Sequence, residues 1–359
     1  MSRSTVEVAT DPPYPVVVGP GVLDGVSKAI SGRSAALVAD RAVASLHLSR
    51  LGAVSDLPRF ECEGGEGAKS LDVLGEVLEF MAAAGLSRSS VLVTLGGGTL
   101  GDLGGLAASL FKRGCGVIHA PTTLLAQVDA SVGGKTAINL EAGKNLAGTF
   151  HQPEAVFADA EVLSTLPDRE FESGLGEVVK TALIAGEAEL GHLEAESERL
   201  RAREAGAVSE AVRLCVSTKA KIVAEDPLEA GPRRALNLGH TFAHGIEHAA
   251  GYGAVPHGIA VAVGLVLAAR GAERAGLAGA PGLPERIETL LGRLGLPSDL
   301  ARLRESCGVT LAPEAILEGL AQDKKGSVGQ PEFVLPRAVG DLELFARLSS
   351  DQIMDLLRG

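Results

Sequence analysis

Short apolar runs alternate with a helical pattern along the first half of the chain. The runs 16–18, 35–39 and 91–95 are bounded by turn residues, as the buried strands of parallel sheets are. Residues 71–84 carry apolar side chains at helical spacing and end at Gly85, a residue type favoured just past a helix. Strands and helices in this alternation predict a parallel α/β sheet of the Rossmann-like kind.

From about residue 163 the spacing becomes helical almost throughout. Strand-like runs nearly vanish, and 333–335 is the main exception. Helices are predicted at 182–203, 207–224, 241–250, 257–275, 285–294, 313–322 and 351–357. We therefore expect an α/β Rossmann-like N-terminal domain at 1–165 and an all-α C-terminal domain at 166–359.

The charge, the apolar runs and the cysteines argue against several classes of protein. Lysine and arginine number 33 against 45 aspartates and glutamates, a net charge of −12 that argues against non-specific nucleic-acid or anionic-lipid binding. The longest apolar run, 259–269, is far shorter than the roughly 20 residues that cross a bilayer. The N-terminus lacks the apolar stretch of a secretory signal. Four scattered cysteines predict free thiols, as is usual in the cytoplasm.

Glycine is unusually frequent, at 46 of 359 residues, about 13% and roughly twice the ordinary share. Ten residues, 96–105, join a predicted strand to a predicted helix, and six of them are glycine. Such a turn lets a diphosphate approach the backbone at a helix N-terminus, but it equally suits tight packing of helix on sheet. Asp40 follows a predicted strand, where it is either a ribose hydroxyl acceptor or a helix N-cap.

The segment 132–136, Val-Gly-Gly-Lys-Thr, ends like a Walker A phosphate loop. The first glycine of that motif would fall at position 129, which is Asp129. The loop is therefore incomplete, and ATPase chemistry is disfavoured.

Four of the eight histidines lie within 240–257. His240, His244 and His248 recur every four residues and so share one helix face. Thr241 stands where a zincin motif requires glutamate, so the sequence does not support that protease mechanism. Two imidazoles and a distant carboxylate form a common catalytic metal site, and a hydrogen-bonded polar helix face is the alternative.

Glu177 and Lys180 lie three residues apart on a mostly apolar helical stretch. Buried charges need partners, so a metal for Glu177 and an anion for Lys180 would account for them. The alternative is a surface ion pair. Other basic residues are scattered beside glycine and asparagine, which suits a pocket for a phosphorylated, carboxylated small molecule.

Taken together, ordered segments from about residue 40 to residue 325 resemble the 3-dehydroquinate synthase family, within the sugar phosphate cyclases. The segments are GGGTLGDLGG, FKRG, APTTLLAQVDASVGGKTAIN, GKNLAGTFHQP, GEVVKTALI, LNLGHTFAHGIE and HG. Two positions depart from the family pattern: Ile259 stands where many relatives carry glutamate, and Pro227 interrupts a charged stretch.

The resemblance implies a role for each matching residue. The ligands of a divalent metal, zinc or cobalt, would be Glu177, His240 and His257. NAD would be bound by Asp40, Glu66, Lys69, Gly97, Gly98, Asp102, Thr122, Thr123, Lys135, Lys144, Thr165 and Leu166. The substrate would contact Asp129, Lys135, Lys144, Asn145, Lys180, Lys219, Arg233, Asn237, His244 and Lys324. Arg113 would reach the substrate of a neighbouring subunit, which implies a homodimer, and His248 would be structural.

The reaction implied by the resemblance converts 3-deoxy-D-arabino-heptulosonate 7-phosphate to 3-dehydroquinate and phosphate. NAD would oxidise a ring hydroxyl transiently, phosphate would leave, the hydride would return, and an intramolecular aldol step would close the carbocycle. Since NAD is regenerated, the enzyme would be a lyase. The alternatives are another cyclase, such as an aminodehydroquinate or valiolone-type synthase, a metal- and NAD-dependent alcohol dehydrogenase and, most distantly, a non-enzymatic binding protein.

Overall fold

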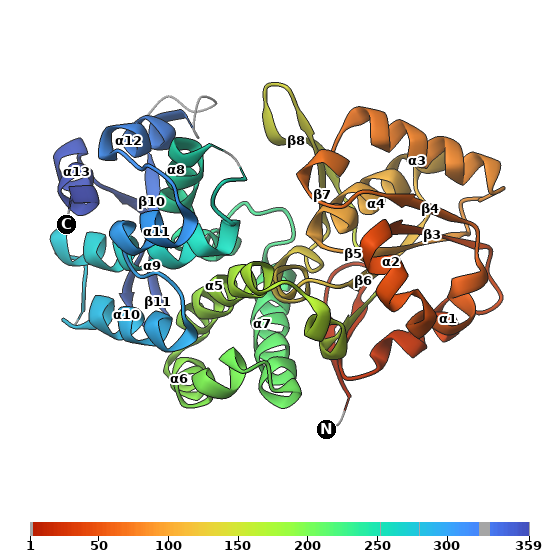
Figure 1. The fold of residues 1–359 in the computed structure, drawn as a ribbon, viewed down its shortest axis with the longest axis horizontal. Coiled ribbons are helices and arrows are strands. Elements are labelled where there is room, and N and C mark those ends of the chain that lie inside the picture. Colours follow the sequence, from red (N-terminus) through yellow and green to blue (C-terminus); the bar gives the residue numbers. More distant parts are fainter. Residues whose placement is uncertain (1–2, 252, 280, 323–330, 359) are drawn as a thin grey trace. The chain divides into compact units, whose positions relative to one another are not determined.

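A computed structural model describes the chain except for residues 1–2, 252, 280, 323–330 and 359 (Figure 1). Its contacts divide the chain into two compact units. The first comprises Met1–Pro167 and Val208–Leu228, and the second comprises Asp168–Ala207 and Glu229–Gly359. The first break lies two residues beyond the expected position 165. The contacts group 208–228 with the first unit, whereas the sequence pattern placed this segment in the second.

The first unit is built on a seven-stranded sheet in the order β1-β2-β9-β6-β5-β3-β4. Apart from the antiparallel edge pair β1 and β2, neighbouring strands are parallel. The strands are β1 (Ser4–Val8), β2 (Tyr14–Gly19), β3 (Ala35–Asp40), β4 (Arg59–Cys62), β5 (Val91–Gly96), β6 (Gly116–Pro121) and β9 (Ala155–Asp159). The runs predicted at 35–39 and 91–95 are thus the interior strands β3 and β5, which confirms the parallel sheet.

The chain reverses direction across the sheet between β3 and β5. From β3 it moves outward to β4, and from β5 it continues the other way to β6 and β9. Helices α3 (Leu71–Ala83) and α4 (Gly98–Leu110) share an apolar core with residues of β3 and β5 on one face. In open α/β sheets, ligands bind at the carboxyl ends of strands beside such a reversal.

Shorter elements complete the first unit. A hairpin of β7 (Lys135–Leu140) and β8 (Gly143–Phe150) extends beside α4 (Figure 1). Helix α7 (Ala205–Glu225) contributes most of its length to this unit. The remaining elements are η1 (Val22–Asp24), α1 (Gly25–Ala29), α2 (Arg41–His47), η2 (Leu48–Asp56), η3 (Glu66–Ala68), η4 (Phe111–Arg113), the π-helical η5 (Ala126–Ala130) and η6 (Ala160–Thr165).

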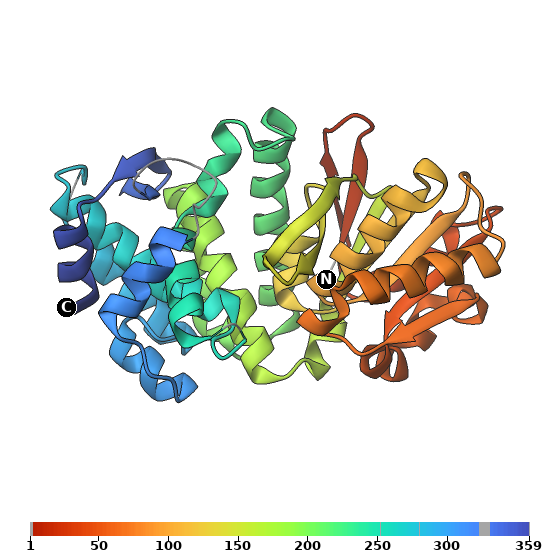
Figure 2. The same ribbon diagram turned by 90° about the horizontal axis from the view of Figure 1, so that it is seen from above.

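The second unit is mostly helical, as Figure 2 shows from above, and several of its helices pack against α9 (His257–Arg274). Its other elements are α5 (Asp168–Ala185), α6 (Glu187–Arg201), η7 (Pro232–Asn237), α8 (His240–Ala250), α10 (Leu283–Leu294), α11 (Leu300–Cys307), α12 (Pro313–Gln322) and α13 (Ser350–Arg358). A hairpin of β10 (Glu332–Ala338) and β11 (Asp341–Arg347) contains the strand-like run 333–335. The helix expected at 182–203 is broken at Gly186, whose φ of 134° separates α5 from α6.

Helix α9 is buried along nearly its whole length and packs against α5, α8 and α10. The apolar run 259–269 therefore belongs to the core of the second unit. Among the helices that the structure describes, none combines the length and the apolar character that crossing a membrane requires.

Candidate active site

The glycine-rich turn lies at the carboxyl end of β5, beside the reversal of the sheet. Helix α4 begins at Gly98, and its N-cap Gly97 offers no side chain to the first N–H groups. A Cβ on Gly97 would lie 3.1 Å from Thr123 Cγ2, and one on Gly98 would lie 3.1 Å from Ala130 Cβ. Both glycines thus allow close packing and also leave a helix N-terminus accessible to an anion. Diphosphate binding and tight packing of the helix on the sheet, the two interpretations of this turn, are therefore compatible.

Asp40 follows β3, adjacent to the same turn. Its Oδ1 accepts from the backbone N–H groups of Ala42 at 2.8 Å and Val43 at 3.2 Å, so Asp40 is the N-cap of α2. A Cβ on Gly96 would lie 3.5 Å from Asp40 Cβ, which places the carboxylate next to the turn. The N-cap interpretation is correct, and the position is also the one that a ribose hydroxyl acceptor would need.

A buried lysine connects two of the predicted ligand sets. Lys69, 4% exposed, donates from Nζ to the carboxylate of Asp102 on α4 and to Oδ1 of Asn145 on β8. Burial raises the pKa of Asp102, and Lys69 opposes this shift. A lysine has three N–H donors, so this arrangement also suits an acceptor on a bound cofactor.

Thr122 and Thr123 follow β6 at the same edge of the sheet. The backbone N–H of Thr122 donates to Gly96 O at 2.9 Å, which joins the ends of β5 and β6. Thr122 Oγ1 is buried and has no hydrogen-bond partner among the residues that the structure describes. Buried hydroxyls usually have a partner, so a ligand here would satisfy it.

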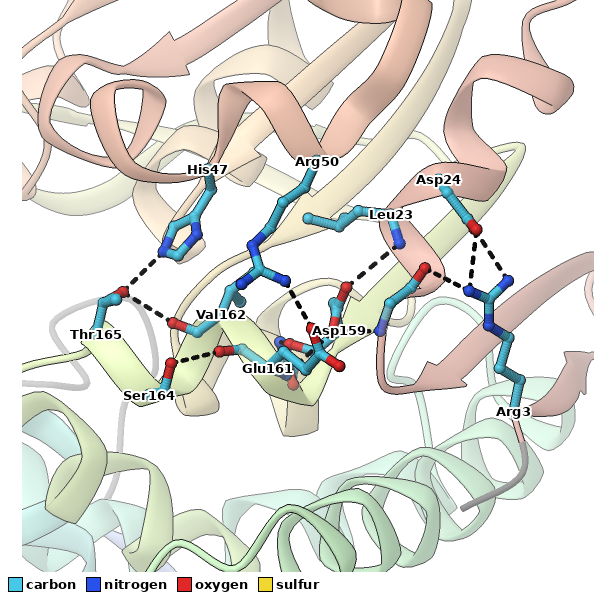
Figure 3. Close-up of polar contacts among 12 residues, drawn as sticks. Arg3, Leu23, Asp24, His47, Arg50, Asp159, Glu161, Val162, Ser164 and Thr165 are labelled. Atoms are coloured by element: carbon cyan, nitrogen blue, oxygen red, sulfur yellow. Dashed lines mark hydrogen bonds and ion pairs between the residues drawn. The ribbon is translucent and has the colours of Figure 1, made fainter.

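Thr165, predicted to close the cofactor site, is tied to α2, the helix that Asp40 caps. Its Oγ1 lies 2.7 Å from His47 Nε2 and donates to Val162 O at 3.0 Å (Figure 3). Burial lowers the pKa of His47, and Arg50 adds to the shift. Leu166 follows directly, and its N–H bonds to Leu163 O.

Asp129 and Lys219 lie 90 residues apart but meet within the first unit. Lys219 Nζ donates to Asp129 Oδ1 at 2.6 Å and to Asp129 O at 2.7 Å. The π-helical turn η5 presents Asp129, and such turns are frequent at functional sites. The lysine of the incomplete phosphate loop, Lys135, is exposed, and Lys144 is half-buried on β8. Arg113 is exposed, with a left-handed φ of 67°.

The predicted metal ligands come together in the second unit. Glu177 Oε1 lies 3.5 Å from His240 Nε2 and 3.7 Å from His257 Nε2, and the two imidazole nitrogens are 3.3 Å apart. Ligands about 2.0–2.2 Å from a tetrahedral zinc ion are separated by about 3.3–3.6 Å. The three atoms therefore suit such an ion, and the interpretation of the histidines as only a polar helix face is not required.

Close packing of backbone brings Glu177 and His257 together. A Cβ on Gly176 would lie 1.9 Å from Gly258 O, and one on Gly258 would lie 1.7 Å from Ser173 O. Ser173 Oγ accepts from the N–H of Gly258 at 3.1 Å. Only glycine lets α5 and the start of α9 approach this closely, and each glycine adjoins a predicted ligand.

Lys180 forms an ion pair with Glu177, and each side chain is 1% exposed. The surface ion pair considered from the sequence is therefore wrong, since both charges are buried. Neither oxygen of Glu177 accepts a geometrically proper hydrogen bond from the residues that the structure describes. A buried carboxylate in this state is a strong candidate for metal ligation.

Glu247 is a residue that the sequence analysis missed. It lies on α8, three residues after His244 and seven after His240, so its place on their face could have been recognised. Its Oε2 lies 3.3 Å from His257 Nδ1, and the side chain is 9% exposed. Burial opposes charge on His257, but the hydrogen bond and charge of Glu247 outweigh it and raise the pKa of His257. Such a carboxylate holds a ligating imidazole in one tautomer.

Three further predicted residues are on or near η7 and α8. Arg233 is 2% exposed, and Asn237 Nδ2 donates to Glu229 Oε1 at 2.9 Å. His244 stands edge-on to His240, with ring centroids 5.8 Å apart. His248 is half-buried. Lys324 lies outside the described residues.

Comparison with known proteins places the chain in the same family that the sequence motifs resemble. Residues 59–173 match the family model described as 3-dehydroquinate synthase N-terminal, and 174–326 match 3-dehydroquinate synthase C-terminal. A 3-dehydroquinate synthase of Xylella fastidiosa (strain M23) is 41% identical over 98% of this chain and 97% of its own length. One of Halorhodospira halophila (strain DSM 244 / SL1) is 42% identical over 96% of each.

Solved structures of sugar phosphate cyclases are similar in fold. A 2-deoxy-scyllo-inosose synthase complexed with carbaglucose-6-phosphate, NAD⁺ and Co²⁺ has a TM-score of 0.88 and 27% identity, covering 99% of both chains. A 2-epi-5-epi-valiolone synthase from Streptomyces hygroscopicus subsp. jinggangensis 5008, with NAD⁺ and Zn²⁺ bound, has a TM-score of 0.81 and 31% sequence identity. The match covers 96% of both chains. A probable glycerol dehydrogenase from Sinorhizobium meliloti 1021 has a TM-score of 0.64 and 17% sequence identity, so it shares the fold alone.

Proposed function

Because the chain belongs to the 3-dehydroquinate synthase family, we propose that it converts 3-deoxy-D-arabino-heptulosonate 7-phosphate to 3-dehydroquinate and phosphate. The observation that carries this proposal is the triangle formed by the buried Glu177 with His240 and His257, with Lys180 beside it. The cyclase structures that resemble this chain hold NAD⁺ and Co²⁺ or Zn²⁺. We infer the same cofactor and a divalent metal for this lyase.

Glu177, His240 and His257 would hold the metal, which supplies a Lewis acid for polarising a substrate oxygen. Glu247 orients His257 through Nδ1, so that the lone pair of Nε2 faces Glu177 and His240. Lys180 places a positive charge against Glu177, where it favours negative charge on a bound substrate oxygen. His244, which lies on α8 with His240, would hold and move protons in the reaction.

In the first unit, the reversal between β3 and β5 would hold the dinucleotide, which supplies reversible hydride transfer. The N–H groups at the start of α4 would bind its diphosphate. Asp40 and Glu66 would accept hydrogen bonds from ribose hydroxyls, and Thr122 Oγ1 would gain the partner that it lacks.

The basic residues would bind the carboxylate and phosphate of the substrate. Lys219 is held by Asp129, which keeps its ammonium in one position despite the long side chain. Arg233, almost fully buried, can offer a planar set of donors to an anionic group. Stabilising the leaving phosphate in this way lowers the barrier to its elimination.

A phosphate-release assay on the heptulosonate phosphate tests the proposal. We expect release that needs metal and NAD, stops with a chelator and produces no net NADH absorbance. Glu177→Gln should abolish turnover because it weakens the metal site, whereas Glu198→Gln on the exposed side of α6 should not. Accumulation of NADH would instead indicate a dehydrogenase, and preference for another sugar phosphate would indicate a related cyclase.

We further propose a cytoplasmic homodimer in which Arg113 acts on the substrate of the neighbouring subunit. The exposed Arg113 and the free cysteines support this. Arg113→Ala and Lys180→Ala should each be inactive, and mixed subunits should regain part of the activity because one intact site forms per heterodimer. No recovery on mixing, with heterodimers demonstrated, would contradict the role of Arg113.

A further inference from the structure

Asn139 lies at an irregular point of the β7–β8 hairpin. Its neighbours pair regularly, Ile138 with Ala147 and Leu140 with Gly143, and the register shifts between them. The backbone N–H of Asn139 donates to Lys69 O at 2.8 Å. The peptide of Asn139 is therefore directed at the segment that precedes α3.

The side chain of Asn139 uses both ends of its amide. Nδ2 donates to Glu66 Oε2 at 2.8 Å, and Oδ1 accepts from the backbone N–H of Asn145 at 2.9 Å. A carboxylate can only accept and a peptide N–H can only donate, so the orientation of the amide is determined. Aspartate, alanine or leucine could not make both bonds.

The backbone of Asn145 is left-handed, with φ of 56°. Asparagine adopts this conformation more readily than most residues other than glycine, but the conformation still costs free energy, and neighbouring hydrogen bonds help to hold it. Asn139 holds the backbone N–H of Asn145, and Lys69 holds its side-chain Oδ1. Because Lys69 O also accepts from Asn139, the three residues form a closed ring of hydrogen bonds.

We propose that Asn139 is a positioning residue that couples the cofactor-binding Glu66 and Lys69 to the substrate-binding Asn145. The roles of those three residues rest on the proposed function. The ring makes their placement mutual: displacement of Asn145 releases one bond of Lys69, and displacement of Glu66 releases one end of the Asn139 amide. Neither Glu66 nor Asn145 then needs to be ordered separately when a ligand binds.

Two variants separate the two ends of the amide. Asn139→Ala removes both side-chain bonds, and we expect the NAD dissociation constant and the substrate KM each to rise about 5- to 30-fold. Asn139→Asp keeps the oxygen that accepts from the N–H of Asn145, but it replaces the donor to Glu66 with a second carboxylate, which repels that of Glu66. We expect it to weaken NAD binding to a similar extent while the substrate KM stays within about threefold of wild type.

Thr149→Ala is the matched control in the same hairpin. Thr149 Oγ1 donates to Ser109 Oγ at 2.8 Å, which anchors β8 to α4, and it makes no bond to the ring. This variant should lower stability without raising either constant. If Asn139→Ala behaves like Thr149→Ala, or if Asn139→Asp leaves NAD binding unchanged, Asn139 does not position the two sets.

Two readouts do not need turnover. NAD binding is measured by calorimetry on metal-loaded protein, and a crystal structure of Asn139→Ala reports the backbone of Asn145. We expect Asn145 to leave its left-handed conformation, and an unchanged φ would overturn the inference. Wild-type protein that released no phosphate would refute the proposed function, while these two measurements would still decide the role of Asn139.

Discussion

The contact between α5 and the start of α9 makes the metal site depend on Gly258. In Gly258→Ala the new Cβ would lie 1.7 Å from Ser173 O, and real Cβ atoms essentially never approach within 3.0 Å of a neighbour. The obstacle is backbone, so no side chain can move aside. The two helices must separate by roughly 1.3 Å, and a core overpacked in this way loses about 1–3 kcal/mol of stability.

The same movement separates two of the three metal ligands. Glu177 lies one residue past Gly176 on α5, and His257 immediately precedes Gly258. Metal sites tolerate deviations of about 0.2 Å from ideal ligand distances, several times less than the required movement. We expect zinc affinity to fall by at least about 100-fold, measured by competition with a chelator, with the far-ultraviolet circular dichroism retained.

Gly191→Ala on α6 is the matched control, because a Cβ there meets nothing within 4 Å. Replacing an unobstructed helical glycine should stabilise the protein by about 0.5–1 kcal/mol and leave zinc affinity unchanged. Folded Gly258→Ala protein with wild-type zinc affinity would refute the argument that this contact sets the ligand geometry.

Three further predictions concern ionisable side chains inside the protein. Lys180→Met should lower the free energy of unfolding by about 3–5 kcal/mol in the presence of a chelator, because it leaves Glu177 without its cation. With zinc bound the loss should be smaller. Equal losses in denaturant unfolding with chelator and with zinc would contradict this. Glu247→Gln should weaken zinc binding about 10- to 100-fold by chelator competition, and an unchanged constant would argue that Glu247 does not orient His257. Burial lowers the pKa of His119 to about 4, so only the unfolded chain takes up that proton as pH falls below about 6.5, and stability falls. His119→Gln should remove up to about 2 kcal/mol of the loss between about pH 7 and pH 5, and unfolding curves of identical pH dependence would contradict it.

The local pattern of the sequence was sufficient for the elements of the sheet. Buried runs and turn residues predicted β3 and β5, and the glycine-rich segment 96–105 was correctly placed at the junction of a strand and a helix, although most of it is the start of α4. Helices in the second half were also predicted, because apolar spacing is a local property of the chain. The break at Gly186 and the short helix α11 were missed: one glycine inside a helical pattern does not reveal its φ, and eight residues give little periodicity.

The residue types of the candidate site could likewise be recognised in the sequence, but the role of each residue was assigned from the family resemblance. Helical spacing placed His240 and His244 on one face, yet the structure brings only His240 into the triangle with Glu177. Spacing along one helix cannot tell which imidazole a carboxylate 63 residues away will face. The same limit hid Glu247, whose partner is the first residue of another helix.

What the sequence determined by itself is therefore the set of strands and helices, together with the residue types capable of binding a metal, a dinucleotide and anions. These follow from interactions between residues a few positions apart. Only the tertiary structure decided which of them meet. Lys219 reaches Asp129 across 90 residues, Lys69 reaches Asn145 across 76, and Glu177 approaches His257 because glycine backbones touch. Such contacts depend on how whole elements pack, and no pattern within one element contains that information.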